Sequence, residues 1–174
     1  MLLYFRKDGD EMSKICCLTG HRHFSAIDVK KLYVRLKNVL TDLIVKEGFT
    51  DFRTGGAMGF DTLAALCILE LKMKYPQIKL HVFVPCENQE KYFPRIDKKV
   101  YRTVLERADA TTLVNKQYSP GVMFARNRAM VKGSDVCVAF MSRRAGGTKY
   151  TVDYAEKAGV KVIHLFDRSL IRVK

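Results

Sequence analysis

Three short stretches of the sequence combine glycine with arginine, histidine or small polar residues, and each comes directly after an apolar run. They are TGHRHF at 19–24, RTGGAMGFD at 53–61 and RRAGGTKYT at 143–151. Glycine lets the backbone bring its N–H groups close to an anion. The N-terminus of a helix that follows such a loop attracts negative charge to the same place. These stretches are therefore candidates for phosphate binding.

The middle stretch contains the most glycine. The candidate ligand-binding residues here are Thr54, Gly55, Gly56, Gly59 and Asp61. The glycines lie where the chain is expected to turn into a helix that begins near Asp61. The pattern is neither the dinucleotide-binding G-x-G-x-x-G nor the P-loop G-x-x-x-x-G-K-[ST], so it supports neither NAD binding of that type nor ATP hydrolysis. Taken alone, the stretch is equally compatible with a glycine-rich turn that binds no ligand.

The third stretch repeats this arrangement further along the chain. Gly146 and Gly147 can approach a ligand, and Thr148 can donate to a phosphate or cap the following helix. Arg143 and Arg144 can add charge-assisted contacts. The alternative is a capped helix start with two exposed arginines. Two such loops in one small domain favour ligand binding, because loops on adjacent strands of a sheet can share one ligand.

The first stretch adds a candidate cation and two histidines. Gly20 permits a turn and Arg22 can hold an anion, while His21 or His23 can donate to a phosphate or act in acid–base chemistry. A later stretch, ARNRAM at 125–130, places further polar residues in a helix, where Arg128 is expected to be solvated. From these two stretches the candidate ligand-binding residues are Thr19, Gly20, His21, Arg22, Arg126 and Asn127.

Strand-like and helix-like patterns alternate along the chain. Strands are expected at 14–20, 50–56, 78–85, 110–115, 135–141 and 160–166. Helices are expected at 29–44, 61–74, 119–133 (with Ser119 as N-cap and Pro120 in the first turn) and 147–159, and Pro94 divides 87–108 into a short and a longer helix. This alternation predicts an α/β fold with a mainly parallel sheet covered by helices on both faces. Ligands of such sheets bind beyond the carboxyl ends of the strands, where the three glycine-containing stretches begin.

Length and charge narrow the class of protein. The 174 residues suit one domain, expected at 14–174 after a poorly ordered extension at 1–13 that does not resemble a secretory signal. The formal net charge of +13 favours an anionic ligand without identifying it. The basic residues are spread along the chain, so solvated charges on helix faces remain the alternative explanation.

The cysteines and the apolar runs suggest where the protein acts. Its five cysteines are scattered, and none has a partner at metal-ligand spacing. We therefore expect reduced, buried cysteines, no metal site and a cytoplasmic protein. No apolar run is long enough to span a membrane, so no membrane partner is expected.

Five motifs in a fixed order resemble a known family. CCLTGHR, TGGAMGFDTLAA, VPCENQEKYF, FARNRAMVKGSDVCVAF and GGTKYTVDYA, between Ile15 and Phe166, are similar to the YpsA/YoqJ-like branch of the SLOG superfamily. That superfamily also contains the LOG phosphoribohydrolases, often labelled lysine decarboxylase-like, and the DprA proteins. The resemblance implies a Rossmann-like, three-layer fold whose glycine-rich loops bind a nucleotide or a nucleotide-derived ligand. It also implies a homo-oligomer.

The resemblance leaves enzymatic activity open. In LOG enzymes the second loop resembles PGGxGTxxE, whose Glu acts with an Arg in cleaving an N-glycosidic bond. The matching stretch AGGTKYTVDYA keeps Gly146, Gly147 and Thr148 but has no Glu at that spacing. Asp153, further along the helix, and Asp61, in the middle loop, are the remaining candidate catalytic carboxylates.

Three functions follow from these observations. The favoured one is binding or sensing of a nucleotide such as a nucleoside monophosphate, ADP-ribose or an NAD-derived ligand. The second is N-glycosidic hydrolysis of a nucleoside monophosphate, in which Arg22 or Arg126 orients the phosphate and Asp61 or Asp153 stabilises positive charge at the ribose. The third is DprA-like binding of single-stranded nucleic acid, for which a basic groove needs aromatic stacking partners. The candidate partners are Tyr92, Phe93, Tyr118 and Phe124.

Overall fold

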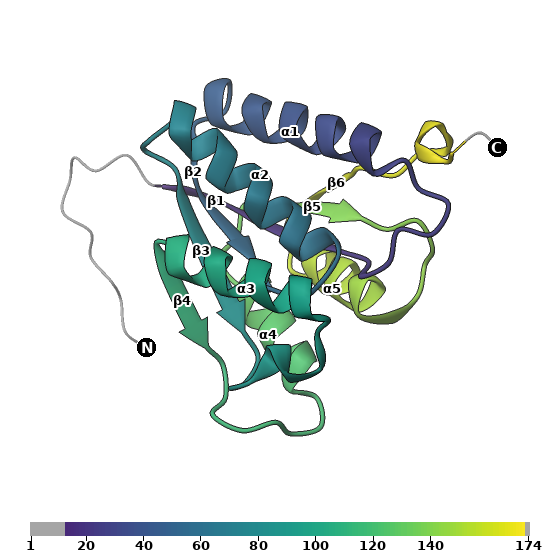
Figure 1. The fold of residues 1–174 in the computed structure, drawn as a ribbon. Helices are drawn as coiled ribbons and strands as arrows, with labels where there is room; N and C mark the ends of the chain where they lie inside the picture. The colour runs from purple at the N-terminus through teal and green to yellow at the C-terminus, as the bar shows by residue number, and fades with distance from the viewer. Residues whose placement is uncertain (1–12, 173–174) are drawn as a thin grey trace.

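The structure, a computed structural model, describes residues 13–172 (Figure 1). The expected N-terminal extension therefore lies outside the described residues, apart from Ser13. The described chain forms one parallel sheet of six strands in the order β4-β3-β2-β1-β5-β6. The strands are β1 (Lys14–Gly20), β2 (Phe49–Thr54), β3 (Lys79–Val84), β4 (Ala110–Leu113), β5 (Val136–Phe140) and β6 (Lys161–His164).

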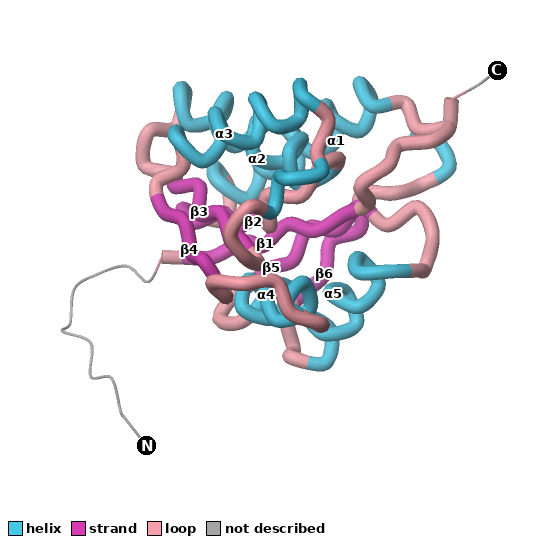
Figure 2. The backbone as a smooth tube through the Cα atoms, turned by 60° about the horizontal axis from the view of Figure 1, so that its bottom comes forward, coloured by secondary structure: helices cyan, strands magenta, loops and turns pink. Residues whose placement is uncertain are grey.

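Helices connect the strands and form the two outer layers. They are α1 (Val29–Val45), α2 (Phe60–Lys74), α3 (Arg95–Arg107), α4 (Val122–Val131) and α5 (Gly146–Lys157), with short 3₁₀ helices η1 (Gln89–Tyr92) and η2 (Arg168–Leu170). Figure 2 shows α1, α2 and α3 on one face of the sheet and α4 and α5 on the other. The predicted α/β, Rossmann-like, three-layer fold with helices on both faces is confirmed.

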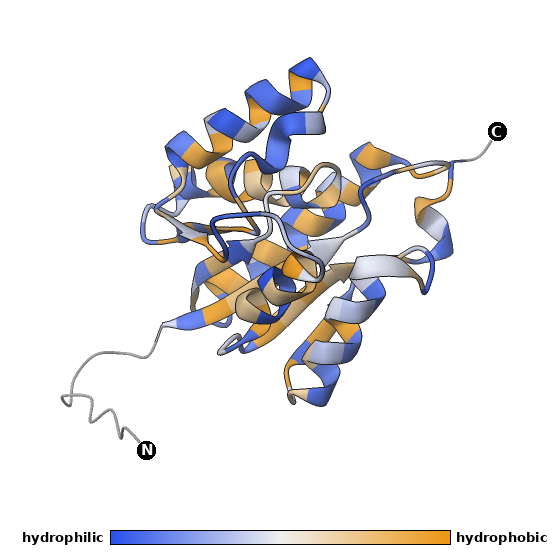
Figure 3. Ribbon diagram, turned by 90° about the horizontal axis from the view of Figure 1, so that it is seen from below, coloured by the Kyte–Doolittle hydropathy of each residue, from blue (hydrophilic) through white to orange (hydrophobic). Residues whose placement is uncertain are grey.

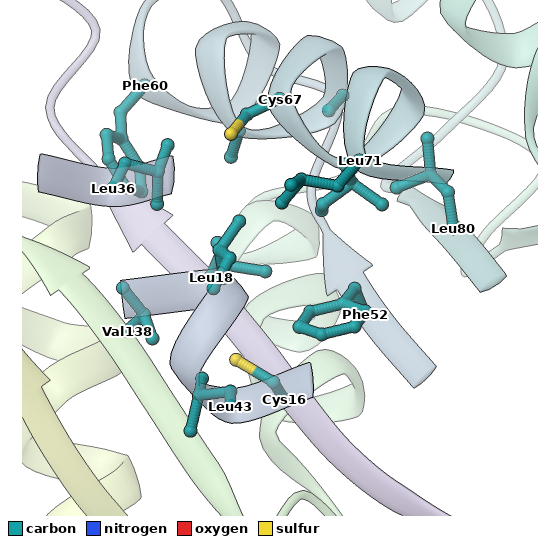
Figure 4. Packing of buried hydrophobic residues seen from close by; sticks show 14 of the residues in the cluster. Cys16, Leu18, Leu36, Leu43, Phe52, Phe60, Cys67, Leu71, Leu80 and Val138 are labelled. Carbon is teal, nitrogen blue, oxygen red and sulfur yellow. The ribbon is translucent and has the colours of Figure 1, made fainter. Parts of the chain in front are cut away.

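Packing of apolar side chains holds these layers together. In Figure 3 the helices mix hydrophilic and hydrophobic residues, whereas the central strands are mainly hydrophobic. The larger core cluster lies between the sheet and α1 and α2, where Leu18, Leu36 and Phe52 are fully buried (Figure 4). A smaller cluster, including Met130 and Cys137, lies beneath α4 and α5. All five cysteines are buried, as expected.

The order of the strands creates a switch point between β1 and β5. From β1 the chain adds β2, β3 and β4 on one side, and then returns through α4 to place β5 on the other side of β1. The connections after β1 and β5 therefore leave toward opposite faces of the sheet (Figure 2). Their divergence opens a crevice beyond the carboxyl ends of these two strands, which is where ligands bind in open α/β sheets.

One predicted helix start is wrong, and one of the two roles considered for Thr148 is not observed. The helix expected at 119–133 begins only at Val122, because Gly121 adopts a left-handed conformation (φ +83°) that separates Ser119 and Pro120 from the helix. Ser119 is therefore not its N-cap. Thr148 does not cap α5 either, since the N-cap residue is Ala145 and Thr148 already lies in the first turn.

Within the described residues, no helix is both long and apolar enough to cross a membrane.

Candidate functional site

A cavity of about 570 Å³ lies beyond the carboxyl ends of β1 and β5, at the switch point of the sheet. Its volume falls within the range of about 300–1,000 Å³ that is usual for small-molecule sites. The three glycine-containing loops and one face of α4 form its walls. The lining residues are Thr19, Gly20, His21, Arg22, His23, Ala57, Asp61, Met123, Phe124, Arg126, Asn127, Met130, Arg143, Ala145, Gly146, Gly147 and Thr148.

The cavity brings most of the sequence-predicted residues together. Those in its wall are Thr19, Gly20, His21, Arg22, Asp61, Arg126, Asn127, Gly146, Gly147 and Thr148. Four predicted residues do not line it: Thr54, Gly55, Gly56 and Gly59. Thr54 is buried and its hydroxyl donates to the carbonyl oxygen of Asp61 (3.2 Å), so it anchors the start of α2.

Asp153 does not lie at the cavity. It follows Thr148 by five residues, which turns it about 140° around the helix away from the cavity wall. There its carboxylate pairs with Lys149, one helical turn earlier, and lies 3.8 Å from Nη2 of Arg144. The expectation that Asp153 acts on a ligand is therefore not supported, and Asp61 is the only one of the two candidate carboxylates in the wall.

Asp61 forms a buried ion pair with Arg126 in the cavity wall. Nη1 of Arg126 lies 3.6 Å from Oδ2 of Asp61, and the two side chains are only 6% and 8% exposed. The backbone N–H of Ala57 donates to the same carboxylate oxygen (3.2 Å). Burial raises the pKa of Asp61 against the opposing effect of the Arg126 charge, and burial lowers the pKa of Arg126.

Arg126 also holds the glycine-rich loop after β2. Its Nη1 donates to the carbonyl oxygen of Gly55, while its Nε is buried without a hydrogen-bond partner among the described residues. A Cβ atom on Gly55 would lie 1.7 Å from this Nη1 and 2.7 Å from Oδ2 of Asp61. Gly55 is therefore needed for the packing of the ion pair, and not for a direct contact with the cavity.

A side chain that was not predicted to belong to the site also binds the glycine-rich loop after β2. Gln89 in η1 donates from Nε2 to the carbonyl oxygen of Gly56 (2.7 Å). The motif VPCENQEKYF contains this glutamine, but nothing in its local pattern shows that it reaches a loop far away in the sequence.

His21 joins the three loops. Its backbone N–H donates to the carbonyl oxygen of Phe140 (3.3 Å), and its carbonyl oxygen accepts from the N–H of Phe60 (3.1 Å). Its ring Nε2 lies 3.1 Å from the carbonyl oxygen and 3.3 Å from the backbone nitrogen of Arg143. One residue thus connects the ends of β1 and β5 and the start of α2.

The rim of the cavity is positively charged, and one helix points its N-terminus into it. The N-cap and first turn of α5, which are Ala145, Gly146, Gly147 and Thr148, line the cavity. No side chain of residues 13–172 caps this end of the helix. Exposed Arg22 and Arg143 lie in the same wall. Free N–H groups, the helix dipole and two guanidinium groups together favour an anion.

The wall formed by α4 has an apolar part as well as the polar residues Arg126 and Asn127, and only these polar residues were predicted from the sequence as part of the nucleotide site. Met123, Arg126, Asn127 and Met130 line the cavity from α4 at the spacing i, i+3, i+4 and i+7. This spacing places them on one face of the helix. The same spacing can be read from the sequence, so this face of the helix could have been predicted from it. Phe124 adds a ring that is 42% exposed, so the wall can contact a flat, apolar group.

We expect the stability of the protein to depend on pH through its partly buried histidines. Burial lowers the pKa of His21 and of His81 below the ordinary value of 6.5, although a backbone hydrogen bond at Arg143 opposes the shift of His21. Between the folded-state pKa and 6.5 the unfolded chain binds more protons, so the free energy of unfolding falls as the pH is lowered through this window.

Urea unfolding at pH values of about 7.5 and about 5.5 measures this dependence. The His21→Gln variant should lose less stability over that interval than the wild type. An equal loss in both proteins would show that His21 does not contribute.

Comparison with known proteins shows which family this chain is similar to. Residues 16–170 match the model of the YspA SLOG family. The SPbeta prophage-derived protein YoqJ of Bacillus subtilis (strain 168) is 33% identical over 139 residues, which cover 73% of this chain and 81% of YoqJ. A UPF0398 protein of Bacillus thuringiensis (strain Al Hakam) is 27% identical over 156 residues, covering 84% of each chain.

Two solved structures share the fold. DNA processing protein A of Helicobacter pylori, described for its single-stranded DNA binding mode, superposes with a TM-score of 0.62 at 19% identity. The alignment covers 89% of this chain and 66% of that one. DprA of Streptococcus pneumoniae gives a TM-score of 0.59 at 16% identity, covering 87% of this chain and 50% of that one. At this level of identity the similarity shows the fold alone.

Proposed function

The chain belongs to the YspA SLOG family, and from this premise we propose that its cavity binds a nucleotide or a nucleotide-derived ligand. The observation that carries the proposal is the convergence of three loops and the uncapped N-terminus of α5 on one cavity at the switch point of the sheet. The N-terminus of α5 attracts an anion, and the apolar residues of α4 can contact a ring. A nucleotide carries both groups, a phosphate and a base.

In this proposal the phosphate lies at the first turn of α5. The N–H groups of Gly147 and Thr148 and the guanidinium of Arg143 supply donors there. The ribose or base lies against Met123 and Phe124 on α4. A nucleoside monophosphate, ADP-ribose or an NAD-derived ligand has this combination of groups.

A thermal-shift screen with these nucleotides, followed by calorimetric titration, tests the proposal. A ligand that binds only the folded state stabilises it by about 2.7 kcal/mol at one hundred times its dissociation constant. We expect a clear rise in melting temperature with at least one nucleotide. No shift with any of them at millimolar concentration would contradict nucleotide binding.

Arg143 and Arg144 offer a matched pair of variants. Both side chains are exposed and adjacent in the sequence, but only Arg143 lines the cavity, whereas Arg144 faces Asp153. We expect Arg143→Gln to weaken nucleotide binding roughly fivefold, the upper end for one exposed charge pair, and Arg144→Gln to leave the affinity unchanged. Calorimetric titration of both variants measures the difference. Equal affinities in the two variants would place the phosphate elsewhere.

The buried carboxylate in the cavity wall favours a second candidate function, hydrolysis of the N-glycosidic bond of a nucleoside monophosphate. Asp61 can stabilise the positive charge that develops at the ribose, beside Arg126. Chromatographic detection of free base after incubation with nucleoside monophosphates tests this activity, with Asp61→Asn as the control. Intact nucleotide after prolonged incubation, together with measurable binding, would exclude it.

Binding of single-stranded nucleic acid and self-association are further proposals. The net charge of +13 and the DprA-like fold support the first, since the Helicobacter pylori protein is described as binding single-stranded DNA. A salt-dependent gel shift of single-stranded DNA tests it. Light scattering during gel filtration tests the homo-oligomer that the family resemblance implies.

A further inference from the structure

A second cavity of about 410 Å³ lies next to the first. The two share one wall, because the ring of Phe124 lines both. The second cavity is bounded by the segment before α4, by the outer side of α4 at Arg128 and by Tyr150 of α5. The second cavity therefore adjoins the proposed nucleotide site at Phe124, while the rest of its lining is separate.

An aromatic pair forms the boundary between the two cavities. The ring centroids of Phe124 and Tyr150 lie 4.4 Å apart at an interplanar angle of 51°. Nη1 of Arg128 donates to the hydroxyl oxygen of Tyr150 (2.6 Å), which holds the phenol ring in place. The pair also belongs to the contact between α4 and α5, and Phe124 remains 42% exposed, so part of its surface is accessible to a ligand.

The chemistry of the second cavity resembles that of a ring-binding subsite. Two aromatic faces and a guanidinium lie together in it, and nucleobases stack on both kinds of group. Asn115 and Ser119, also in its wall, carry polar groups that can bond to the edge of a base. The first cavity already provides the anion site for a phosphate. A ring that leaves the first cavity past Phe124 therefore enters a second site suited to stacking.

We propose that the second cavity binds a second ring of the ligand, so that the protein recognises two nucleoside units joined through phosphate. The inference rests on the proposed function, because the first unit occupies the first cavity. Both a dinucleotide of the NAD type and a short single-stranded oligonucleotide have this chemistry.

Calorimetric titration with AMP, NAD and the 5′-phosphorylated dinucleotide pdApdA tests the proposal. We expect at least one of the two-ring ligands to bind about tenfold more tightly than AMP, the scale of a single base-stacking contact. The ligand with the higher affinity then distinguishes the two sources, a dinucleotide or a nucleic-acid strand.

Tyr150 is the residue to change, because it lines only the second cavity. Tyr150→Ala should remove the preference for two-ring ligands, while its affinity for AMP should change less than about twofold. Tyr150→Phe keeps the ring and should therefore retain the preference. Tyr154→Ala is the matched control, since Tyr154 is also a partly buried tyrosine of α5 but lines neither of these cavities.

The outcomes separate this inference from the proposed function. If AMP, NAD and pdApdA bind with equal affinity, the second subsite is overturned and the nucleotide site remains. The same conclusion follows if Tyr150→Ala still prefers the two-ring ligands. No binding of any of the three would overturn both. If Tyr150→Ala fails to fold, its affinity for AMP falls as well. The Tyr150→Phe variant then serves as the test, because it keeps the ring. Loss of the preference for two-ring ligands in Tyr150→Phe would overturn the subsite.

Discussion

The Arg126→Met variant is expected to lose about 3–5 kcal/mol of its free energy of unfolding, the usual cost of removing one partner from a buried ion pair. Methionine fills most of the volume of the arginine side chain without its charge. Asp61 would then remain buried without its charged partner, its charge stabilised by the backbone N–H groups of the glycine-rich loop and by the charge of Arg22. The Gly55 carbonyl oxygen would lose its donor. Because the pair also forms part of the cavity wall, nucleotide binding should weaken in the same variant.

Urea unfolding at neutral pH measures this loss. Arg128→Met is the control, since Arg128 lies on the same helix but is exposed and bonded only to the Tyr150 hydroxyl among the described residues. It should lose less than about 1 kcal/mol. A loss below that value in Arg126→Met would show that the buried pair is not important for stability.

The pH dependence of Arg126→Met provides an independent check on the cause. Without Arg126, burial should raise the pKa of Asp61 further above its ordinary value of 3.8. Between 3.8 and the raised value the folded protein binds more protons than the unfolded chain, so stability falls as pH rises and recovers as pH is lowered. The deficit of the variant should therefore shrink in acid. Adding Asp61→Asn should recover part of the stability at neutral pH, and a deficit that is the same at all pH values would contradict this account.

The Gly59→Ala variant should lose about 3 kcal/mol, because two costs combine at this position. Gly59 precedes α2 with φ +77° and ψ −121°, a conformation that residues with a side chain rarely adopt. A Cβ atom there would lie 2.3 Å from the carbonyl oxygen and 2.5 Å from the Cα of Arg22. The obstacle is backbone, so it cannot be relieved by a change of rotamer. The loops after β1 and β2 would have to separate.

Gly121→Ala isolates the first of these costs, the backbone strain. Gly121 precedes α4 and also has a positive φ (+83°), but no atom in the described part of the chain lies within 4 Å of the position of its Cβ. Its replacement should cost only the backbone strain, about 1 kcal/mol. Chemical denaturation of both variants gives the comparison. If Gly59→Ala were no more destabilised than Gly121→Ala, the close approach to Arg22 would have no energetic importance.

The elements of the fold were predictable because each one depends on neighbouring residues. In α1, Leu32, Leu36, Leu40 and Leu43 recur at helical spacing and are buried against the sheet. In β5 a continuous apolar run indicated a strand covered on both faces, and all its residues are buried. The errors occurred where two local signals competed. Ser119 and Pro120 resemble a helix start, but the left-handed Gly121 that follows them places the start three residues later, at Val122.

The candidate site was predictable only in part. Glycine, arginine and histidine after the expected strands marked the three loops that line the cavity, since a parallel sheet places the carboxyl ends of its strands at one edge. The same glycines did not reveal what each of them contacts. Gly55 packs against Arg126 and Asp61, whereas Gly146 lies in the cavity wall, and the two have the same local pattern.

Hydrophobic periodicity, glycine and proline act over a few neighbouring residues, so they are enough to predict the class of the fold, the order of its elements and the loops that carry polar residues. Three features could be seen only in the folded protein: β5 lies beside β1, Arg126 on α4 pairs with Asp61 on α2, and Asp153 turns away from the cavity. These contacts join residues far apart in the chain, and no local pattern encodes them. They follow from the strand order, which sets which loops meet at the switch point and which side chains are buried there together.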